Sequence, residues 1–362
     1  MRLMRTNLII LLTIVVSFCS VQANEVAPVQ SAEKEAFNPK ELIFHHILDT
    51  YEWHVTTIGE NEISVPLPII LYSKTTGFHY FMSSAFHHGT TSYEGFHIPH
   101  EGPFKGKIVE VDATGAEVRP IDLSITKNVT ALFVSIALLL FIFLTIAKRY
   151  SQNYARAPKG IQSWLEPIII FIRDDIAKAS IGEEKYAKYL PYLLTVFFFI
   201  FINNLMGLVP FIPGGANVTG NIAVTVVMAM FTFAITTFSG TKDYWMHIIN
   251  MPGVPWWLKI PVPLMPVVEI MGVFIKPFVL TVRLFANITA GHIVVLGFYS
   301  LIFVFGQKNM FAGYGVSVVS IAFTIFMGLI ELLVAFIQAY VFTLLSAIYF
   351  SMALEKSHAE KH

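Results

Sequence analysis

From about residue 129 onward, the chain consists of long continuous apolar stretches separated by polar segments. A helical bilayer span needs about 20 apolar residues, and five stretches qualify, at about 129–147, 189–209, 221–238, 264–305 and 315–352. The last two are too long for one upright crossing, because some 42 helical residues reach roughly 63 Å and the hydrocarbon core is about 30 Å thick. We expect these two helices to tilt strongly, to break or to extend beyond the bilayer.

Two polar segments between the spans have the pattern of interfacial structure. Residues 161–179 are amphipathic and interrupted by Pro167, and we expect them to lie at the membrane surface. Residues 244–266 carry three tryptophans and five prolines, which is typical of a connector with aromatic anchors. The predicted fold class is therefore an all-α polytopic membrane protein with five transmembrane helices plus interfacial amphipathic helices, the last two transmembrane helices being long and strongly tilted.

The N-terminus follows the pattern of a secretory signal. Arg2 and Arg5 precede a short apolar run at 8–18, and small residues around Ala23 offer a cleavage site. An uncleaved N-terminal anchor is the alternative. The single cysteine, Cys19, lies in this segment, so a mature chain would have no thiol for disulfides, metal ligation or nucleophilic catalysis.

Between the signal and the first span, the pattern becomes that of short strands. Asn38 and Pro39 begin a short helix that reaches about Leu48. Strand-like runs separated by turn signals follow at 51–58, 63–72, 78–82, 107–111 and 117–121. We therefore predict a signal peptide at 1–23, a small exported β-rich cap of α+β type at 24–126, a transmembrane domain at 127–355 and a cytoplasmic tail at 356–362.

Most of the histidines lie in the predicted cap. A metal site is one interpretation, and a set of irregularly spaced surface histidines is the other, because no H-E-x-x-H or similar motif is present. The eight histidines, out of twelve in the chain, are His45, His46, His54, His79, His87, His88, His97 and His100.

Composition supports the membrane assignment. Hydrophobic residues make up 55% of the chain and charged residues 13%, against about a quarter charged in soluble domains, and the mean hydropathy is +0.64. The zero net charge gives no indication of nucleic acid. No nucleotide-binding loop is present, so we predict no cofactor.

Lysine and arginine predict the orientation of the spans. The segment 148–188 holds eight of them, 239–260 holds two and 210–220 holds none. The positive-inside rule therefore assigns 148–188, 239–260 and the C-terminus to the cytoplasm. The cap is then periplasmic, as expected for a multi-pass protein of a bacterial inner membrane.

Ionisable residues inside a membrane are costly and usually functional, and most of those in this chain lie in the last two spans. Glu269, Lys276 and Arg283 are seven residues apart and share one slowly drifting helical stripe. Asn287 is one turn beyond Arg283. His292, nine residues after Arg283, points to nearly the opposite face.

The fifth span carries Glu331 and Gln338 on one face. Because the two spans run in opposite directions, we expect His292 to pair with Glu331 on the outer side, and Arg283 with Gln338. Arginine is not deprotonated in proteins, so it cannot pass a proton itself. It can attract a carboxylate and keep it ionised, and it can separate two polar vestibules.

Purely structural roles are the alternatives for these residues. Lys276 could extend its charge to the interface, Glu269 could pair with Lys276, and His292 with Glu331 could form an inert buried pair.

The motif R-L-F-A-N-I-T-A-G-H at 283–292 closely resembles the signature of subunit a of F-type ATP synthases. The resemblance covers about 127–355 and extends to Glu269, Lys276-Pro277, 203–210 and 338–342. It implies a non-catalytic, proton-translocating stator subunit with two half-channels, in which Arg283 faces an acidic residue of the rotating c-ring. It also implies peripheral stalk b subunits and membrane lipid as partners. The family often has Glu and His at the two outer positions, and here they are exchanged between the spans, as in other members.

Two other functions are compatible with parts of the pattern. A self-contained secondary ion transporter would show inverted repeats, and no clear repeat is present. A membrane-anchored exported metal-binding module would use the cap histidines, but it leaves Arg283 unexplained.

Overall fold

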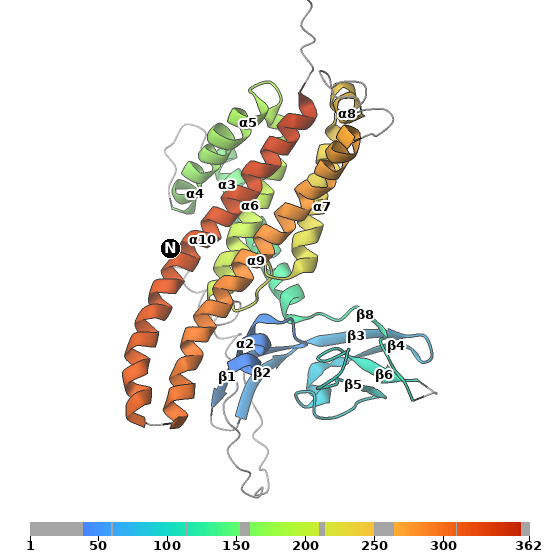
Figure 1. Cartoon of the computed structure of the whole chain (residues 1–362), viewed down its shortest axis with the longest axis vertical. Coiled ribbons are helices and arrows are strands. Elements are labelled where there is room, and N and C mark those ends of the chain that lie inside the picture. Colours follow the sequence, from blue (N-terminus) through green and yellow to red (C-terminus); the bar gives the residue numbers. More distant parts are fainter. Residues whose placement is uncertain are drawn as a thin grey trace, which may run out of the picture. The chain divides into compact units, whose positions relative to one another are not determined.

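The computed structural model describes residues 39–58, 61–112, 115–152, 160–209, 214–249, 264–308 and 310–355 (Figure 1). The predicted signal peptide, residues 24–38 of the predicted cap and the predicted tail at 356–362 lie outside the described residues.

Five helices are long and apolar enough to cross a membrane. They match the predicted spans to within a few residues at most ends, which confirms the predicted fold class. They are α3 (Lys127–Gln152), α6 (Tyr186–Leu208), α7 (Ile222–Ser239), α9 (Leu264–Lys308) and α10 (Met310–Leu354).

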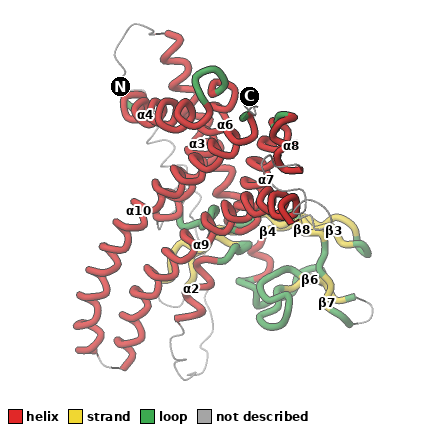
Figure 2. The backbone as a smooth tube through the Cα atoms, turned by 45° about the horizontal axis from the view of Figure 1, so that its top comes forward, coloured by secondary structure: helices red, strands yellow, loops and turns green. Residues whose placement is uncertain are grey.

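Helices α9 and α10 run side by side (Figures 1 and 2). Each is 45 residues long, which corresponds to about 68 Å of helix. Neither is broken, and α9 continues through Pro277. Of the three possibilities for the over-long spans, a break is therefore excluded, and the helices must tilt or extend beyond a hydrocarbon core of about 30 Å.

Helix α9 packs against α7 and α10. Its buried positions Leu280, Leu284 and Ile288 recur every four residues and form one stripe in the main apolar core. Helix α10 contributes alanines to this core, among them Ala339 and Ala347, and small side chains allow membrane helices to approach closely. The rotation of α9 about its own axis is set by this stripe.

The segment predicted as interfacial forms α4 (Ile161–Phe171), the π-helical η2 (Ile172–Lys178) and α5 (Ala179–Ile181). It is amphipathic, since Ile172 and Ile176 are fully buried while Trp164 is exposed. Pro167 does not interrupt α4. Of the predicted connector at 244–266, the structure describes the part in α8 (Lys242–Ile249) and the start of α9, and 250–263 lie outside the described residues.

The cap contains one helix, a hairpin and two small sheets in its described part. The hairpin pairs β1 (Glu52–Ile58) with β2 (Asn61–Pro66), the first sheet has the order β4-β3-β8, and the second has the order β5-β6-β7. The remaining elements are α2 (Pro39–Ile47), β3 (Pro68–Ser73), β4 (Gly77–Met82), η1 (Ser83–Phe86), β5 (Phe96–His97), β6 (Val109–Val111), β7 (Glu117–Val118) and β8 (Ile121–Asp122).

Two of the predicted strands were wrong as single elements. The run 63–72 is divided between β2 and β3, which belong to different structures, and Pro66 and Pro68 flank the division. The run 117–121 is divided between β7 and β8 next to Pro120. Proline cannot donate a ladder hydrogen bond, so each pairing pattern ends at these positions.

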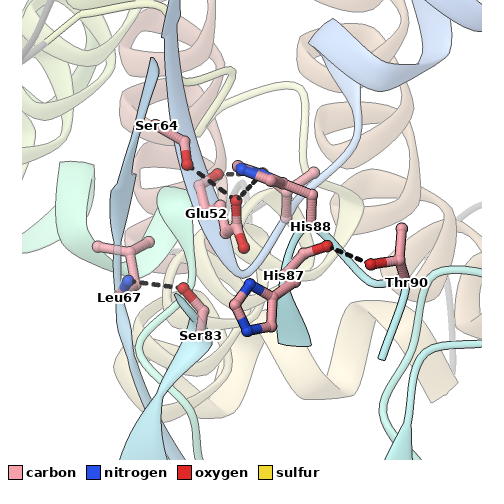
Figure 3. A network of polar contacts seen from close by, with 8 residues as sticks. Glu52, Ser64, Leu67, Ser83, His87, His88 and Thr90 are labelled. Atoms are coloured by element: carbon pink, nitrogen blue, oxygen red, sulfur yellow. Dashed lines mark hydrogen bonds and ion pairs between the residues drawn. The ribbon is translucent and has the colours of Figure 1, made fainter. Parts of the chain in front are cut away.

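The histidines of the described cap pair with carboxylates in three places. His79 lies 2.6 Å from Glu94, His97 lies 3.4 Å from Glu117, and His88 lies 2.8 Å from Glu52. Figure 3 shows that Glu52 also accepts a hydrogen bond from Ser64. In the part of the chain that the structure describes, no group of three or more His, Cys, Asp or Glu side chains could hold a metal ion, so nothing here supports the metal-site interpretation.

One carboxylate stabilises the cap internally and another connects it to the first span. The Tyr51 hydroxyl donates a 2.5 Å hydrogen bond to Asp122 of β8. Asp49 accepts hydrogen bonds from the Thr126 hydroxyl and the Asn128 amide at the start of α3. Burial, followed by the hydrogen bond to Asp122, raises the pKa of the Tyr51 hydroxyl above its usual range.

We expect Tyr51→Phe to lower the free energy of unfolding of the cap by about 1–2 kcal/mol at neutral pH, because Asp122 loses a buried donor. A tyrosine whose pKa is raised by folding stabilises the fold below about pH 10, and this contribution is lost as pH rises further. Proteolysis rates of the cap in the full chain, compared at about pH 8 and about pH 10.5, should therefore rise less steeply in the variant. Tyr80→Phe, which alters an exposed ring, is the control. Equal alkaline sensitivity of wild type and Tyr51→Phe would contradict the assignment.

Candidate functional site

The predicted site residues lie on α9 and α10. The buried stripe Leu280, Leu284 and Ile288 turns Arg283 and Asn287 to the exposed side of α9. Arg283 lies near the middle of the 42-residue span of this helix. Within the described residues, no hydrogen bond or ion pair engages its guanidinium. A permanent cation is thus presented at mid-span on the outside of this subunit.

The outer pair is present as predicted. His292 Nδ1 lies 2.9 Å from Glu331 Oε1, with side chains that are 14% and 7% exposed. The contact has ion-pair distance, yet Glu331 Oε1 accepts no hydrogen bond of suitable geometry. A buried carboxylate at this distance from an imidazole can exchange a proton with it after a small rotation of either side chain.

Two glycines make room for the pair. A Cβ atom on Gly291 would lie 3.1 Å from Glu331 Oε1, whereas one on Gly207 of α6 would lie 3.5 Å from His292 Nε2. The first contact is tighter than ordinary van der Waals contact and the second is ordinary. Hence α6, α9 and α10 approach closely at His292 and Glu331.

A polar contact between α6 and α10 lies beside the pair. Asn204 donates a hydrogen bond of 3.3 Å to the carbonyl of Ala335, one turn after Glu331, and accepts one of 2.5 Å from Thr219. Gln338, almost one turn further, is buried. Asn204 appeared in the sequence only as part of the family resemblance, and the structure gives it a role in positioning α10.

The inner half of α9 carries the remaining charges. Lys276 Nζ lies 5.5 Å from the ring centroid of Tyr349 and 3.9 Å from Met352 Sδ, both on α10. Burial, and after it the Glu269 charge, raises the pKa of Tyr244 in α8. Glu269, Lys276 and Arg283 form a series of charged residues, seven apart, along α9.

A small cavity of about 10 Å³ lies beside this series, enough for about one water molecule. Its polar lining comes from Thr232 and Thr236 of α7, Tyr244 of α8, Lys276 of α9 and Tyr349 of α10. The Thr232 hydroxyl is 2.8 Å from Tyr192 of α6 and 3.3 Å from Ser346 of α10. Hydroxyl groups therefore continue the polar region from α9 into the bundle.

Two features of the site differ from the sequence analysis. No hydrogen bond joins Arg283 to Gln338 in the described part of the chain, because Arg283 points outward and Gln338 is buried. Tyr349 was not among the predicted site residues. It follows Glu331 by 18 residues, which is five helical turns, and so lies on the same face of α10. This spacing is the sequence signal that could have identified it.

Together, five spanning helices, a mid-span arginine on an outer surface and a buried His–Glu pair define an ion-translocating membrane subunit. The family model described as ATP synthase A chain matches residues 129–351. The chain therefore belongs to the ATP synthase A chain family, and it is the proton-channel stator subunit a of an F-type ATP synthase, without a catalytic site of its own. It is a multi-pass membrane protein, and membership implies partners in the Fo complex such as the c-ring and b subunits.

Individual relatives agree with the family match. ATP synthase subunit a 2 of Chlorobaculum tepidum is 39% identical over 348 residues, covering 93% of this chain and 79% of the relative. ATP synthase subunit a of Chloroherpeton thalassium is 43% identical over 245 residues, covering 66% and 69%. ATP synthase subunit a 2 of Prosthecochloris aestuarii is 47% identical over 239 residues, covering 64% and 69%. The resemblance seen in the sequence is confirmed, and the transporter and metal-module hypotheses are set aside.

The cap has a match of its own. A second family model, described as a domain of unknown function (DUF8433), matches residues 42–127. This range corresponds to the β-rich region and ends where α3 begins.

We expect Gly291→Ala to reduce ATP-driven proton pumping by roughly tenfold in assembled complexes, because its methyl group displaces Glu331 from His292. Gly207→Ala is the matched control. It also adds one methyl group to a helix next to the pair, but this methyl group would meet the His292 ring at ordinary contact distance. Both changes raise helix propensity by about 1 kcal/mol, so a loss shared by both would point to another cause. Fluorescent pH indicators in membrane vesicles measure the rate. Normal pumping by Gly291→Ala would show that the His292–Glu331 spacing is unimportant.

Proposed function

We propose that Arg283 separates two aqueous half-channels and faces the acidic residue of the c-ring. The supporting observation is its exposed position at mid-span without an ion-pair partner in the described chain. A guanidinium is costly in lipid unless it is paired. A carboxylate on a neighbouring subunit would supply that pairing, and Arg283 would hold it ionised until a proton arrives.

His292 and Glu331 form the outer part of the path in this proposal. Protons enter from the periplasm, pass between the two side chains and reach the c-ring carboxylate. The short, buried contact between imidazole and carboxylate supports a relay. Two further side chains supply polar groups where the c-ring carboxylate arrives. Gln338 is buried on α10, two turns after Glu331, and Asn287 is exposed on α9, one turn after Arg283.

The inner half-channel runs past Glu269 in this proposal. A c-ring carboxylate that has rotated through lipid releases its proton near the series Glu269, Lys276 and Arg283. The cavity lined by Lys276 supports a polar exit on this side. Contact of Lys276 with Tyr349 also anchors α9 to α10.

We also propose the orientation and domain limits indicated by the charges. The segments 148–188 and 239–260 and the tail at 356–362 are cytoplasmic. The signal peptide occupies 1–23, the periplasmic cap 24–126 and the transmembrane domain 127–355. The protein then lies in the bacterial inner membrane, with the peripheral stalk b subunits and lipid around it.

Arg283→Ala should abolish ATP-driven proton pumping and coupled ATP synthesis, at least a hundredfold loss, because no cation attracts the c-ring carboxylate. Vesicles carrying the assembled complex allow pumping and passive proton leak to be recorded together. Added leak would show that Arg283 also separates the half-channels. The neighbouring Val282→Ala, which removes only apolar surface, is the control. Normal pumping by Arg283→Ala in an intact complex would overturn the proposal.

Exchanging the outer pair tests the relay separately. His292→Ala should reduce pumping roughly a hundredfold, the lower end of the range expected for loss of a proton-transfer group. The double exchange His292→Glu with Glu331→His keeps one imidazole and one carboxylate, so it should recover most of that loss. The pH dependence of pumping should shift in the double variant while assembly stays unchanged. A double variant as inactive as His292→Ala would argue that these residues do more than relay.

A further inference from the structure

The sheet β4-β3-β8 of the cap has one buried face. Ile69 and Leu71 of β3 and Phe81 of β4 point into the cap core, where they meet Phe96 of β5 and Ile108, which directly precedes β6. Figure 1 shows the β5 and β6 strands lying against β3 and β4. In the described cap, the residues of this core pack on the face of the sheet that carries Ile69, Leu71 and Phe81.

The opposite face is apolar but exposed. Phe78 is 74% exposed and Tyr80 is 71% exposed, and the Phe78 ring contacts Tyr72 with centroids 4.8 Å apart. Strand pairing places Tyr72 opposite Phe78 on β4 and opposite Ile121 on β8. We name this surface the aromatic face, and it consists of Tyr72, Phe78, Tyr80, Met82, Ile121 and Leu123.

Such a face needs a partner. An antiparallel sheet with one side in water normally alternates apolar inward and polar outward residues. Here the outward positions are aromatic or aliphatic as well, and contiguous exposed apolar surface marks protein or membrane contact. Six large apolar side chains on three neighbouring strands are more than scattered surface residues.

The aromatic face is connected to the first span, α3, by a short segment that is hydrogen-bonded to the cap. The Leu123 amide donates to Ile70, the Ile125 amide donates to Pro68, and the Lys127 amide, at the start of α3, donates to Thr50. The linker is thus hydrogen-bonded to the cap up to the first span. Leu123 lies four residues before Lys127, so at most about 14 Å of extended chain separates them.

We propose that the aromatic face rests on the bilayer at the side where α3 begins, with its rings at the level of the lipid headgroups. Tyrosine and other aromatic side chains are favoured in this region, where an apolar ring and a polar group meet both environments. Its continuity with the first span favours lipid over a protein partner. Exposed Lys74 and Arg119 flank Tyr72 and Ile121 in the sequence and suit lipid phosphates. The proposal does not depend on the proton path.

The test places a fluorophore on the face of the full chain in the assembled complex. In a Cys19→Ser background, Tyr80→Cys or Ile121→Cys is labelled, and the complex is reconstituted in vesicles that carry nitroxide on the lipid headgroups. The control is Lys105→Cys, which is exposed and precedes Ile108 on the covered side of the sheet. Contact with the interface predicts roughly threefold more lipid quenching at Tyr80→Cys and Ile121→Cys than at Lys105→Cys.

Iodide in the buffer distinguishes the outcomes. Strong lipid quenching with weak iodide quenching at both face positions supports the proposal. Equal behaviour of face and control positions would mean that the face lies in water, and would overturn it. Protection from both lipid nitroxide and iodide would mean that protein covers the face, either another subunit or residues 24–38 of this chain, and would overturn it as well.

Discussion

Leu280, Leu284 and Ile288 pack α9 into the apolar core with α7 and α10, and this contact sets the direction of every polar group on α9. Arg283 and Asn287 lie on one side of this stripe and are exposed, while His292, nine residues after Arg283, lies on its other side and approaches α6 and α10. The apolar stripe thus separates Arg283, which has no ion-pair partner in the described chain, from His292, which pairs with Glu331.

The same packing places the two ends of α9 in different surroundings. Around His292, glycines and the Asn204 contact bring three helices together, and Glu331 is buried. Around Lys276, hydroxyl-bearing residues from three helices line a small cavity. Mid-span charge is tolerated in a membrane only where such polar surroundings or a partner charge exist, so the arrangement suits a protein whose task is to move protons in complex with a rotor.

The cap extends this architecture beyond the spans. Its sheet continues through backbone hydrogen bonds to the start of α3, and Asp49 accepts hydrogen bonds there from the Thr126 hydroxyl and the Asn128 amide. Since the cap's own core uses only one face of the β4-β3-β8 sheet, the position of the cap relative to the bilayer depends on what meets the other face. A cap seated on lipid would restrain α3, and the cap helix α2 also packs against α9.

The sequence by itself determined the five spans, the family and the charged stripe, because span length, residue type and helical periodicity are local properties. It also indicated the pairing of His292 with Glu331, since two antiparallel spans place residues of matching depth together. Only the tertiary structure decided that Arg283 is exposed without a hydrogen bond to Gln338 in the described chain, that Tyr349 contacts Lys276, and that the runs 63–72 and 117–121 are each divided between two sheets. These outcomes depend on how each helix rotates against its neighbours and on which strands pair across the cap, and neither is encoded within a single segment.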